Sequence, residues 1–258
     1  MNTQPTQTIS LMKLPSTDKY LVFDAGPIIS LALNNLLWTL KPLKEQFGGR
    51  FLISKPVLDE LILTPLRIHR FEFEALQTLS LVKEGILEVI AHDEELRKAA
   101  GVLMNLANDS FVYEGRSMKI VHEGEMSSLA IALKVKADAY VIDERNTRML
   151  IESPLDLKNL LEKKLHTKID VKRNSIAGFS SAAKISVLRS SELVLAAYKL
   201  GLLDKFVPDK EYARECAGPD MTGSGPKRIL LNSALWAVKL NGCAIPTYEI
   251  ERVVKRES

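Results

Sequence analysis

The sequence has 258 residues, 46% of them hydrophobic and 26% charged, an ordinary globular composition that can bury a sizeable core without disulfide or metal staples. Its formal net charge of +3 at pH 7 excludes a broadly basic nucleic-acid coat, so any contact with nucleic acid has to come from a local patch. Cys216 and Cys243 lack metal-ligand spacing and form no disulfide framework, which favours a reducing, cytoplasmic setting.

The N-terminal residues 1 to 16 are expected to form a flexible tail. They have neither the basic n-region nor the apolar h-region of a signal peptide. The apolar stretch from 28 to 40 is too short to span a bilayer and is interrupted by Asn34 and Asn35, so we expect no membrane association.

The first predicted strand is the continuous apolar run of residues 20 to 23, Tyr-Leu-Val-Phe, which suits a strand buried on both faces. The run ends at Asp24. A tight turn follows, and Pro27 suits the first turn of the helix that comes next. The order of strand, acid, turn and helix is the pattern on which the rest of the interpretation depends.

A second short strand is predicted over residues 51 to 53, and the helix after it carries Glu60. Thr64 and Pro65 suit the cap and the first position of another helix, which we expect to run unbroken to about Glu84. The next predicted elements are, in order, a strand, a helix and an irregular loop near the site: residues 85 to 90, 93 to 106 and 108 to 120.

Residues 121 to 148 contain the strand and acid pattern a second time. A helix begins near Glu125, because apolar residues recur after it at helical spacing. Residues 140 to 142 then form a short buried strand that stops at Asp143. Ligands of open parallel sheets bind at the edge where strands end, so we expect the strands before Asp24 and Asp143 to be parallel neighbours.

The remaining chain is predicted to add a fifth strand over residues 185 to 188 and a helix over 191 to 200. Residues 208 to 226 are rich in Gly and Pro and form the clearest linker. A final helical pair follows, and its apolar stripe from Leu230 to Val238 is either core or a dimer face.

Four acids stand out at these positions: Asp24, Glu60, Glu125 and Asp143. They are far apart in the chain, so only the fold can bring them together, and such a cluster would raise its own pKa values unless a cation offsets the charge. Hard cations such as Mg²⁺ or Mn²⁺ prefer carboxylate oxygen, and the four scattered histidines offer no competing cluster. An all-carboxylate site suits phosphodiester hydrolysis, in which metal ions ionise the attacking water and stabilise the leaving oxygen.

Four stretches of the chain resemble, in order, the motifs of PIN-domain nucleases. They are Leu-Val-Phe-Asp-Ala-Gly-Pro-Ile-Ile-Ser-Leu-Ala (21 to 32), Pro-Val-Leu-Asp-Glu-Leu (56 to 61), Gly-Glu-Met-Ser-Ser-Leu-Ala-Ile-Ala (124 to 132) and Val-Ile-Asp-Glu-Arg (141 to 145). The last two are similar to the branch whose third motif is Gly-Glu and whose fourth is Asp, a second acid and Arg. The resemblance covers about residues 20 to 206.

This resemblance implies a three-layer α/β/α sandwich around a parallel sheet and metal-dependent cleavage of RNA, often single-stranded. Carried over residue by residue, it makes Asp24, Glu60, Glu125 and Asp143 both the catalytic residues and the metal ligands. Two departures stand against a small toxin: the insert near residues 150 to 184 and the helical C-terminal extension. The expected organisation is a PIN-like nuclease domain over 17 to 207 and a linker with helical extension over 208 to 258.

Each acid also has a simpler interpretation. Asp24 and Asp143 can cap the helices that follow them, Glu125 can favour the positive end of its helix, and Glu60 can be a solvated helix acid. Glu123 can replace Glu125 as the third ligand.

The leading hypothesis is therefore a cytoplasmic, Mg²⁺- or Mn²⁺-dependent endoribonuclease. Residues 158 to 189 hold six Lys and two Arg against Glu162 and Asp170, a net charge of +6 that either binds the RNA backbone or forms a solvated face. One alternative is a non-cleaving PIN-like module that binds RNA or protein, and another is the toxin of a toxin–antitoxin pair. The expected partners are RNA, a protein antitoxin or a second copy in a homodimer.

Overall fold

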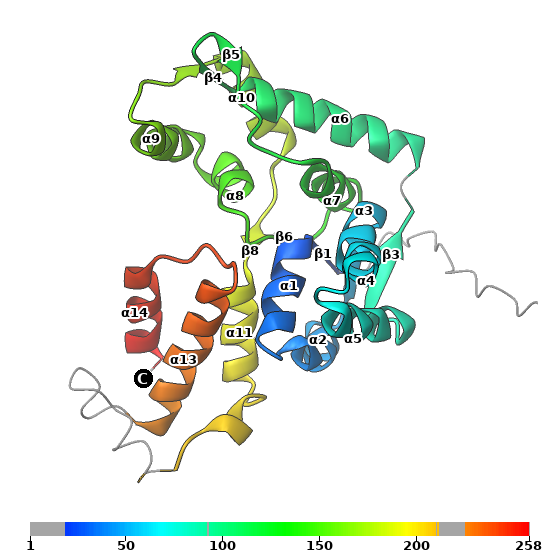
Figure 1. The fold of residues 1–258 in the computed structure, drawn as a ribbon, viewed down its shortest axis with the longest axis vertical. Helices are drawn as coiled ribbons and strands as arrows, with labels where there is room; N and C mark the ends of the chain where they lie inside the picture. The colour runs from blue at the N-terminus through cyan, green and yellow to red at the C-terminus, as the bar shows by residue number, and fades with distance from the viewer. Residues whose placement is uncertain (1–18, 92, 210, 212–224, 258) are drawn as a thin grey trace, which may run out of the picture.

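A parallel sheet of five strands lies at the centre of the protein, in the order β3-β2-β1-β6-β8 (Figure 1). The structure is a computed structural model, and it describes residues 19 to 91, 93 to 209, 211 and 225 to 257. The strands are β1 Tyr20–Phe23, β2 Arg50–Ser54, β3 Leu87–Ile90, β6 Ala139–Val141 and β8 Val187–Leu188. All five predicted strands are present, and the predicted α/β class with a parallel sheet is confirmed. The expected tail over 1 to 16 and most of the expected linker over 208 to 226 lie outside the described residues.

The two faces of the sheet are covered by different sets of helices, which makes three layers. Side chains alternate between the faces along a strand, so Tyr20 and Val22 enter one core while Leu21 and Phe23 enter the other. The core of Tyr20 is covered by α6 Glu94–Asp109, α7 Glu123–Lys134, α8 Arg145–Glu152, α9 Pro154–Leu165 and α10 Arg173–Ala182. The core of Phe23 is covered by α1 Ala25–Leu33, α2 Leu40–Phe47, α5 Glu72–Lys83, α11 Ser190–Lys199, α13 Pro226–Leu240 and α14 Thr247–Arg256.

Three short helical turns follow β2 and connect it to α5: α3 Lys55–Leu58, the π-helical turn η2 Asp59–Leu63 and α4 Thr64–Ile68. The expected single helix from Thr64 to Glu84 is wrong, because His69 (φ 56°) and Phe71 (φ 64°) adopt the left-handed conformation and turn the chain between α4 and α5. Neither residue is a glycine, so no residue type in this stretch predicts the turn. Two 3₁₀ turns also occur in the described residues, η1 Leu37–Thr39 and η3 Asp204–Phe206.

A second, smaller sheet of three antiparallel strands lies at the edge of the molecule, in the order β5-β4-β7. Its strands are β4 Phe111–Tyr113, β5 Arg116–Ser117 and β7 Asp170–Val171. The stretch expected to be an irregular loop over 108 to 120 therefore contains a β-hairpin. Lys172 and Ser175 donate to Asp109 at the end of α6, and Ser117 of the hairpin donates to the same carboxylate at 2.9 Å, which ties the hairpin to the start of α10.

The segment near 150 to 184 is an integral layer of the fold. Leu157, Leu161, Ile169 and Phe179 are buried in the core that also holds Tyr20. Because the apolar faces of α9 and α10 cover the sheet, the lysine-rich face of α9 turns to solvent.

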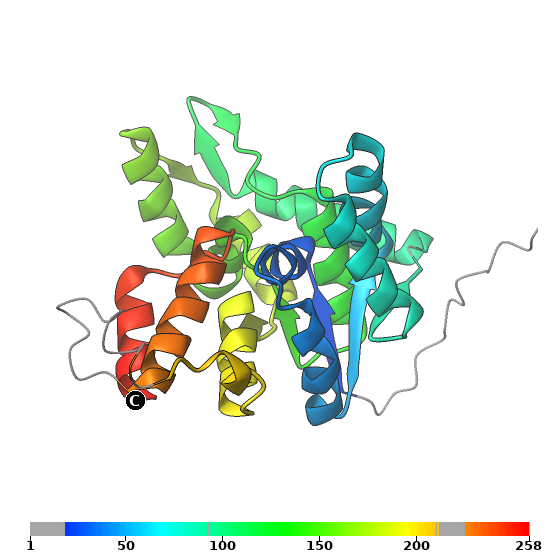
Figure 2. The same cartoon turned by 60° about the horizontal axis from the view of Figure 1, so that its bottom comes forward.

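The C-terminal helices α13 and α14 also belong to the central structure. The two helices lie beside α11 (Figures 1 and 2). Their buried residues, including Leu231 and Val254, join the same core as Phe23. The Arg189 guanidinium, at the start of α11, is buried and donates to Glu249 of α14 at 3.0 Å. Among the described helices, none combines the length and apolar character that a membrane crossing needs.

We predict that Leu231→Ala lowers the free energy of unfolding by about 2–5 kcal/mol, because Leu231 is 1% exposed and its removal leaves a cavity in the shared core. Leu240→Ala, at a position of α13 that is 75% exposed, is the matched control and should change stability by less than about 0.5 kcal/mol. Urea unfolding followed by circular dichroism measures both. Equal stabilities of the two variants would mean that α13 is not part of the core.

Candidate functional site

The predicted pairing of the strands before Asp24 and Asp143 is present in the structure. β1 and β6 are parallel neighbours, with Val22 opposite Tyr140, and the Asp24 backbone N–H donates to the Val141 carbonyl at 2.9 Å. Gly26 packs against both acids, since a β-carbon on it would lie 3.6 Å from Asp24 Oδ2 and 3.4 Å from the Asp143 β-carbon. The two aspartates therefore lie at one edge of the sheet.

Asp24 is both a helix cap and a buried acid in an acidic environment. Its Oδ2 accepts a hydrogen bond from the Gly26 N–H at 3.4 Å, as the capping interpretation expected. Only 7% of the residue is exposed. Burial, together with the negative charges of Glu125 and Glu60, raises the pKa of Asp24 from 3.8 to about 7.

Glu125 lies in the first turn of α7 and is also buried. Its Oε2 accepts from the Thr147 hydroxyl of α8 and from the His122 N–H at 3.4 Å. Burial raises the pKa of Glu125 to about 7, although the Thr147 hydrogen bond opposes the shift. Glu123, the alternative ligand, is exposed on the same turn, so the structure places Glu125 and not Glu123 among the other acids.

Glu60 approaches the same place from the π-helical turn η2. Its Oε2 lies 3.7 Å from where a β-carbon on Gly124 would be, so its carboxylate lies against the start of α7. Loss of solvent raises the pKa of Glu60, and the charge of His122 opposes this. Glu60 is more exposed than Asp24 and Glu125, which suits a group at the mouth of a site.

The structure adds Glu144, which the sequence analysis did not select. Its Oε2 accepts from the Thr147 N–H at 2.7 Å and caps α8. The hydroxyl of the same Thr147 donates to Glu125, so one threonine holds both carboxylates. Burial, together with the negative charges of Asp24, Glu125, Glu144 and Glu60, raises the pKa of the Tyr140 phenol well above its usual value.

Asp143 points to the opposite side of the sheet from Glu144. It is 2% exposed, and its Oδ2 accepts from the Ser30 hydroxyl at 2.6 Å and the Ser190 hydroxyl at 2.7 Å. Its Oδ1 accepts from the Ser190 N–H at 2.8 Å, at the start of α11. Both carboxylate oxygens therefore face donors of the protein, and the role of Asp143 as a metal ligand stays a prediction.

The alternation of strand residues explains why neighbouring acids separate. Tyr140 and Ile142 enter the core beneath α7, whereas Val141 enters the core beneath α1. A period of two then sends Glu144 toward Glu125 and Asp143 toward Ser30. The same parity applied to β6 in the sequence could have selected Glu144.

No lysine or arginine among the described residues makes an ion pair with Asp24, Glu60, Glu125 or Glu144. A set of carboxylate oxygens without a protein cation matches the preference of hard divalent ions, so the donors fit Mg²⁺ or Mn²⁺. No group of three or more His, Cys, Asp or Glu side chains in the described part of the chain is already arranged to hold a metal ion.

Comparisons with known proteins assign the chain to no family. No protein-family model matches it, and no solved structure matches it. It is 26% identical over 132 residues to a 1-deoxy-D-xylulose-5-phosphate synthase of Haemophilus influenzae (strain PittGG). This match covers 50% of the chain and 20% of the synthase, so the aligned region spans about a fifth of that protein.

We predict that Asp24→Asn makes the metal-free protein more stable at pH 8 than the wild type. Between the unfolded pKa of 3.8 and the folded pKa of about 7, the native Asp24 holds a proton that the unfolded chain has lost. Its contribution to stability therefore falls as the pH rises through this window, by at most a few kcal/mol, or about 1.4 kcal/mol per pKa unit. Asparagine does not titrate and still caps α1.

Urea unfolding at pH 5 and pH 8 in a chelator measures this difference. Asp93→Asn is the control, because Asp93 also caps a helix but its pKa is lowered by the Leu96 N–H and Lys134. That variant should gain no stability at pH 8. An Asp24→Asn protein with the pH dependence of the wild type would show that Asp24 is ionised without cost.

Proposed function

We propose that this chain is a metal-dependent endoribonuclease that hydrolyses RNA phosphodiester bonds. The observation that carries the proposal is that Asp24, Glu60, Glu125 and Glu144 lie near one another at one end of the parallel sheet, with no ion-pair partner in the described part of the chain. The resemblance of the four motifs to PIN-domain nucleases supports the same reaction. A cytoplasmic location agrees with the free, buried thiol of Cys243.

We propose the ligand roles for three of the predicted acids, Asp24, Glu60 and Glu125, and we add Glu144 to them. Asp24, Glu125 and Glu144, with Glu60 at the mouth, would hold the Mg²⁺ or Mn²⁺. When bound, such a cation lowers the pKa of water and stabilises charge on the leaving oxygen. In the metal-free protein the pKa values of Asp24 and Glu125 are raised to about 7, so their charged forms lack the compensation that a bound cation would supply.

The hydrogen bonds on Asp143 suggest a supporting role for this residue. It joins β6, α1 and α11 through Ser30 and Ser190, and Ser30 Oγ also lies 3.3 Å from the Asn241 carbonyl before α14. We therefore propose that Asp143 positions the edge of the sheet. Glu144 would then replace Asp143 as the fourth metal ligand.

The basic segment supplies cations for an RNA backbone. Three of its eight basic side chains are engaged within the protein: Lys158 with Glu162, Lys172 with Asp109, and Arg189 with Glu192 and Glu249. The other five are exposed and make no ion pair in the described part of the chain: Lys163, Lys164, Lys168, Arg173 and Lys184. Cations free of protein partners can neutralise phosphates, which supports RNA binding along α9 and α10.

Two alternative functions use the same surface. A non-cleaving module would bind RNA or a protein through these residues without needing an ion at the carboxylates. A toxin would additionally need a protein antitoxin. The raised pKa values of two buried acids favour the enzyme, because a purely binding module gains nothing from buried, unpaired carboxylates.

We predict that the wild type cleaves a labelled single-stranded RNA in the presence of Mn²⁺ and that Asp24→Asn lowers the rate at least about 100-fold, a typical cost of removing one charge-stabilising group. Glu123→Gln is the matched control, since Glu123 is exposed on the turn that carries Glu125. It should cleave at the wild-type rate. Equal cleavage by wild type and Asp24→Asn, or none by the wild type, would count against the nuclease.

A second comparison separates the two adjacent acids, Asp143 and Glu144. We expect Glu144→Gln to weaken Mn²⁺ binding by about 10-fold or more, as loss of a group at a metal site does, with little change in stability. Asp143→Asn should bind Mn²⁺ as the wild type does but unfold about 1–3 kcal/mol more easily, because a buried hydrogen-bond set is broken. Calorimetric titration and urea unfolding measure these quantities. The reverse pattern would restore Asp143 as the ligand.

A further inference from the structure

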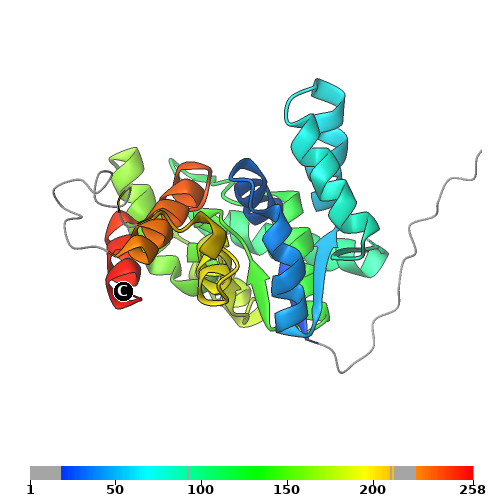
Figure 3. The same ribbon diagram turned by 90° about the horizontal axis from the view of Figure 1, so that it is seen from below.

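Several large apolar side chains are exposed on the helical turns after β2 and on the helix α5 that follows them. These side chains are Leu63, Ile68, Phe71, Phe73 and Leu76. We call the face formed by η2, α4 and α5 the hairpin surface, after the helical hairpin that these elements form, which is separate from the β-hairpin of β4 and β5. Figure 3 shows these cyan helices standing out from the rest of the fold. Single exposed apolar residues are ordinary, but a cluster on one projecting element indicates a contact surface.

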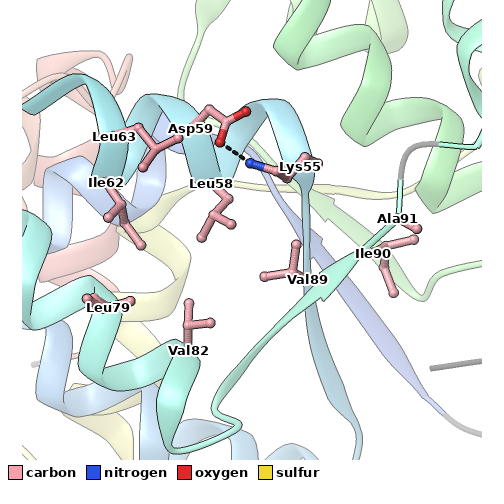
Figure 4. A pocket seen from close by; sticks show the side chains of 10 residues that line it. All are labelled: Lys55, Leu58, Asp59, Ile62, Leu63, Leu79, Val82, Val89, Ile90 and Ala91. Carbon is pink, nitrogen blue, oxygen red and sulfur yellow. Dashed lines mark hydrogen bonds and ion pairs between the residues drawn. The ribbon is translucent and has the colours of Figure 1, made fainter. Parts of the chain in front are cut away.

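Two hollows flank this surface. The larger has a volume of about 490 Å³ and lies between η2, α5 and the end of β3, with Leu58, Ile62, Val82 and Val89 among its lining (Figure 4). Its polar lining side chains, Lys55 and Asp59, are paired with each other. The larger hollow is therefore an apolar socket with no charge left to recognise a polar ligand.

The smaller hollow, of about 120 Å³, lies on the other side of η2 and has a different lining. Apolar side chains, Ile29, Leu33 and Phe71, are combined with the carboxylates of Glu60 and Glu74. Neither glutamate has an ion-pair partner among the described residues. This hollow is suited to an aliphatic stem that ends in a positive charge.

The same surface also carries the complementary groups. Phe73 (69% exposed) and Ile68 (60% exposed) protrude from it as apolar knobs. Arg67 and Arg70 are exposed and have no ion pair in the described part of the chain, and Arg70 lies 4.8 Å from the Phe71 ring. Protruding apolar side chains, apolar hollows, and arginines and glutamates without an ion pair in the described part of the chain thus occur together on η2, α4 and α5.

We propose that the hairpin surface binds the hairpin surface of a second copy of this chain. A two-fold interface is self-complementary, so each copy must offer both halves of every contact, and this surface does. Phe73 and Ile68 of one copy would fill the larger hollow of the other, and its arginines would face Glu74.

Nucleic acid fits this surface less well. Residues 60 to 76 contain two arginines and three glutamates, a formal charge of −1 with histidine neutral, which does not attract phosphate. Most of the exposed apolar groups are aliphatic and offer no ring for a base to stack on. The proposal does not depend on the proposed nuclease activity, because it concerns only how two chains associate.

Light scattering coupled to size-exclusion chromatography tests the proposal on the full chain. The wild type should have twice the monomer mass of 28.8 kDa at concentrations of the order of 100 µM. Phe73→Glu and Ile68→Glu should each weaken association at least about tenfold and shift the mass toward the monomer, since they place charges in an apolar contact. Circular dichroism should show both variants folded as the wild type, because each side chain is exposed.

Leu155→Glu is the matched control, since Leu155 on α9 is 67% exposed and lies on the other side of the sheet. It should keep the dimer mass. A monomeric wild type, or a dimer that survives both hairpin variants, overturns the proposal. So does a monomer whose binding of labelled RNA is lost in Phe73→Glu, because that result assigns the surface to nucleic acid.

Discussion

The parallel pairing of β1 with β6 is the contact on which the rest of the site depends. Paired residues of the two strands, such as Leu21 and Ala139, are 118 residues apart in the sequence, so no local interaction could place Asp24 beside the end of β6. The Asp24 N–H extends the ladder one residue beyond β1 by donating to Val141. The peptide bond that orients the buried carboxylate is thus itself held by the sheet.

Much of this arrangement was predictable because it rests on simple patterns. Strands such as Tyr20–Phe23 are covered on both faces, so they are continuous apolar runs that end visibly at an acid. Strand alternation predicts that Asp143 and Glu144 lie on opposite sides of the sheet. Predicting which of the two faces Glu125 also requires the strand register and the position of α7. The turn at His69 and Phe71 was not predictable, because two non-glycine residues adopt a left-handed conformation that only tertiary packing can impose.

The two neighbouring acids show how the environment decides what a carboxylate can do. Asp143 is surrounded by hydroxyl and N–H donors, which replace water for its negative charge. Asp24 is buried to a similar degree with only weak donors and with other carboxylates nearby, so its charged form is unfavourable. Asp143 is therefore a fully hydrogen-bonded link between β6, α1 and α11. The negative charge of Asp24 has no comparable compensation.

The position of the C-terminal helices has a consequence for how the protein is made. α13 and α14 follow every other element in chain order, yet they complete the core beneath α1 and bring Glu249 to Arg189. During translation Asp24 and Glu125 leave the ribosome long before these helices do. A nascent chain therefore carries these acids on an unfinished core, and a chain that ends before residue 226 has an exposed apolar face where α13 and α14 would pack.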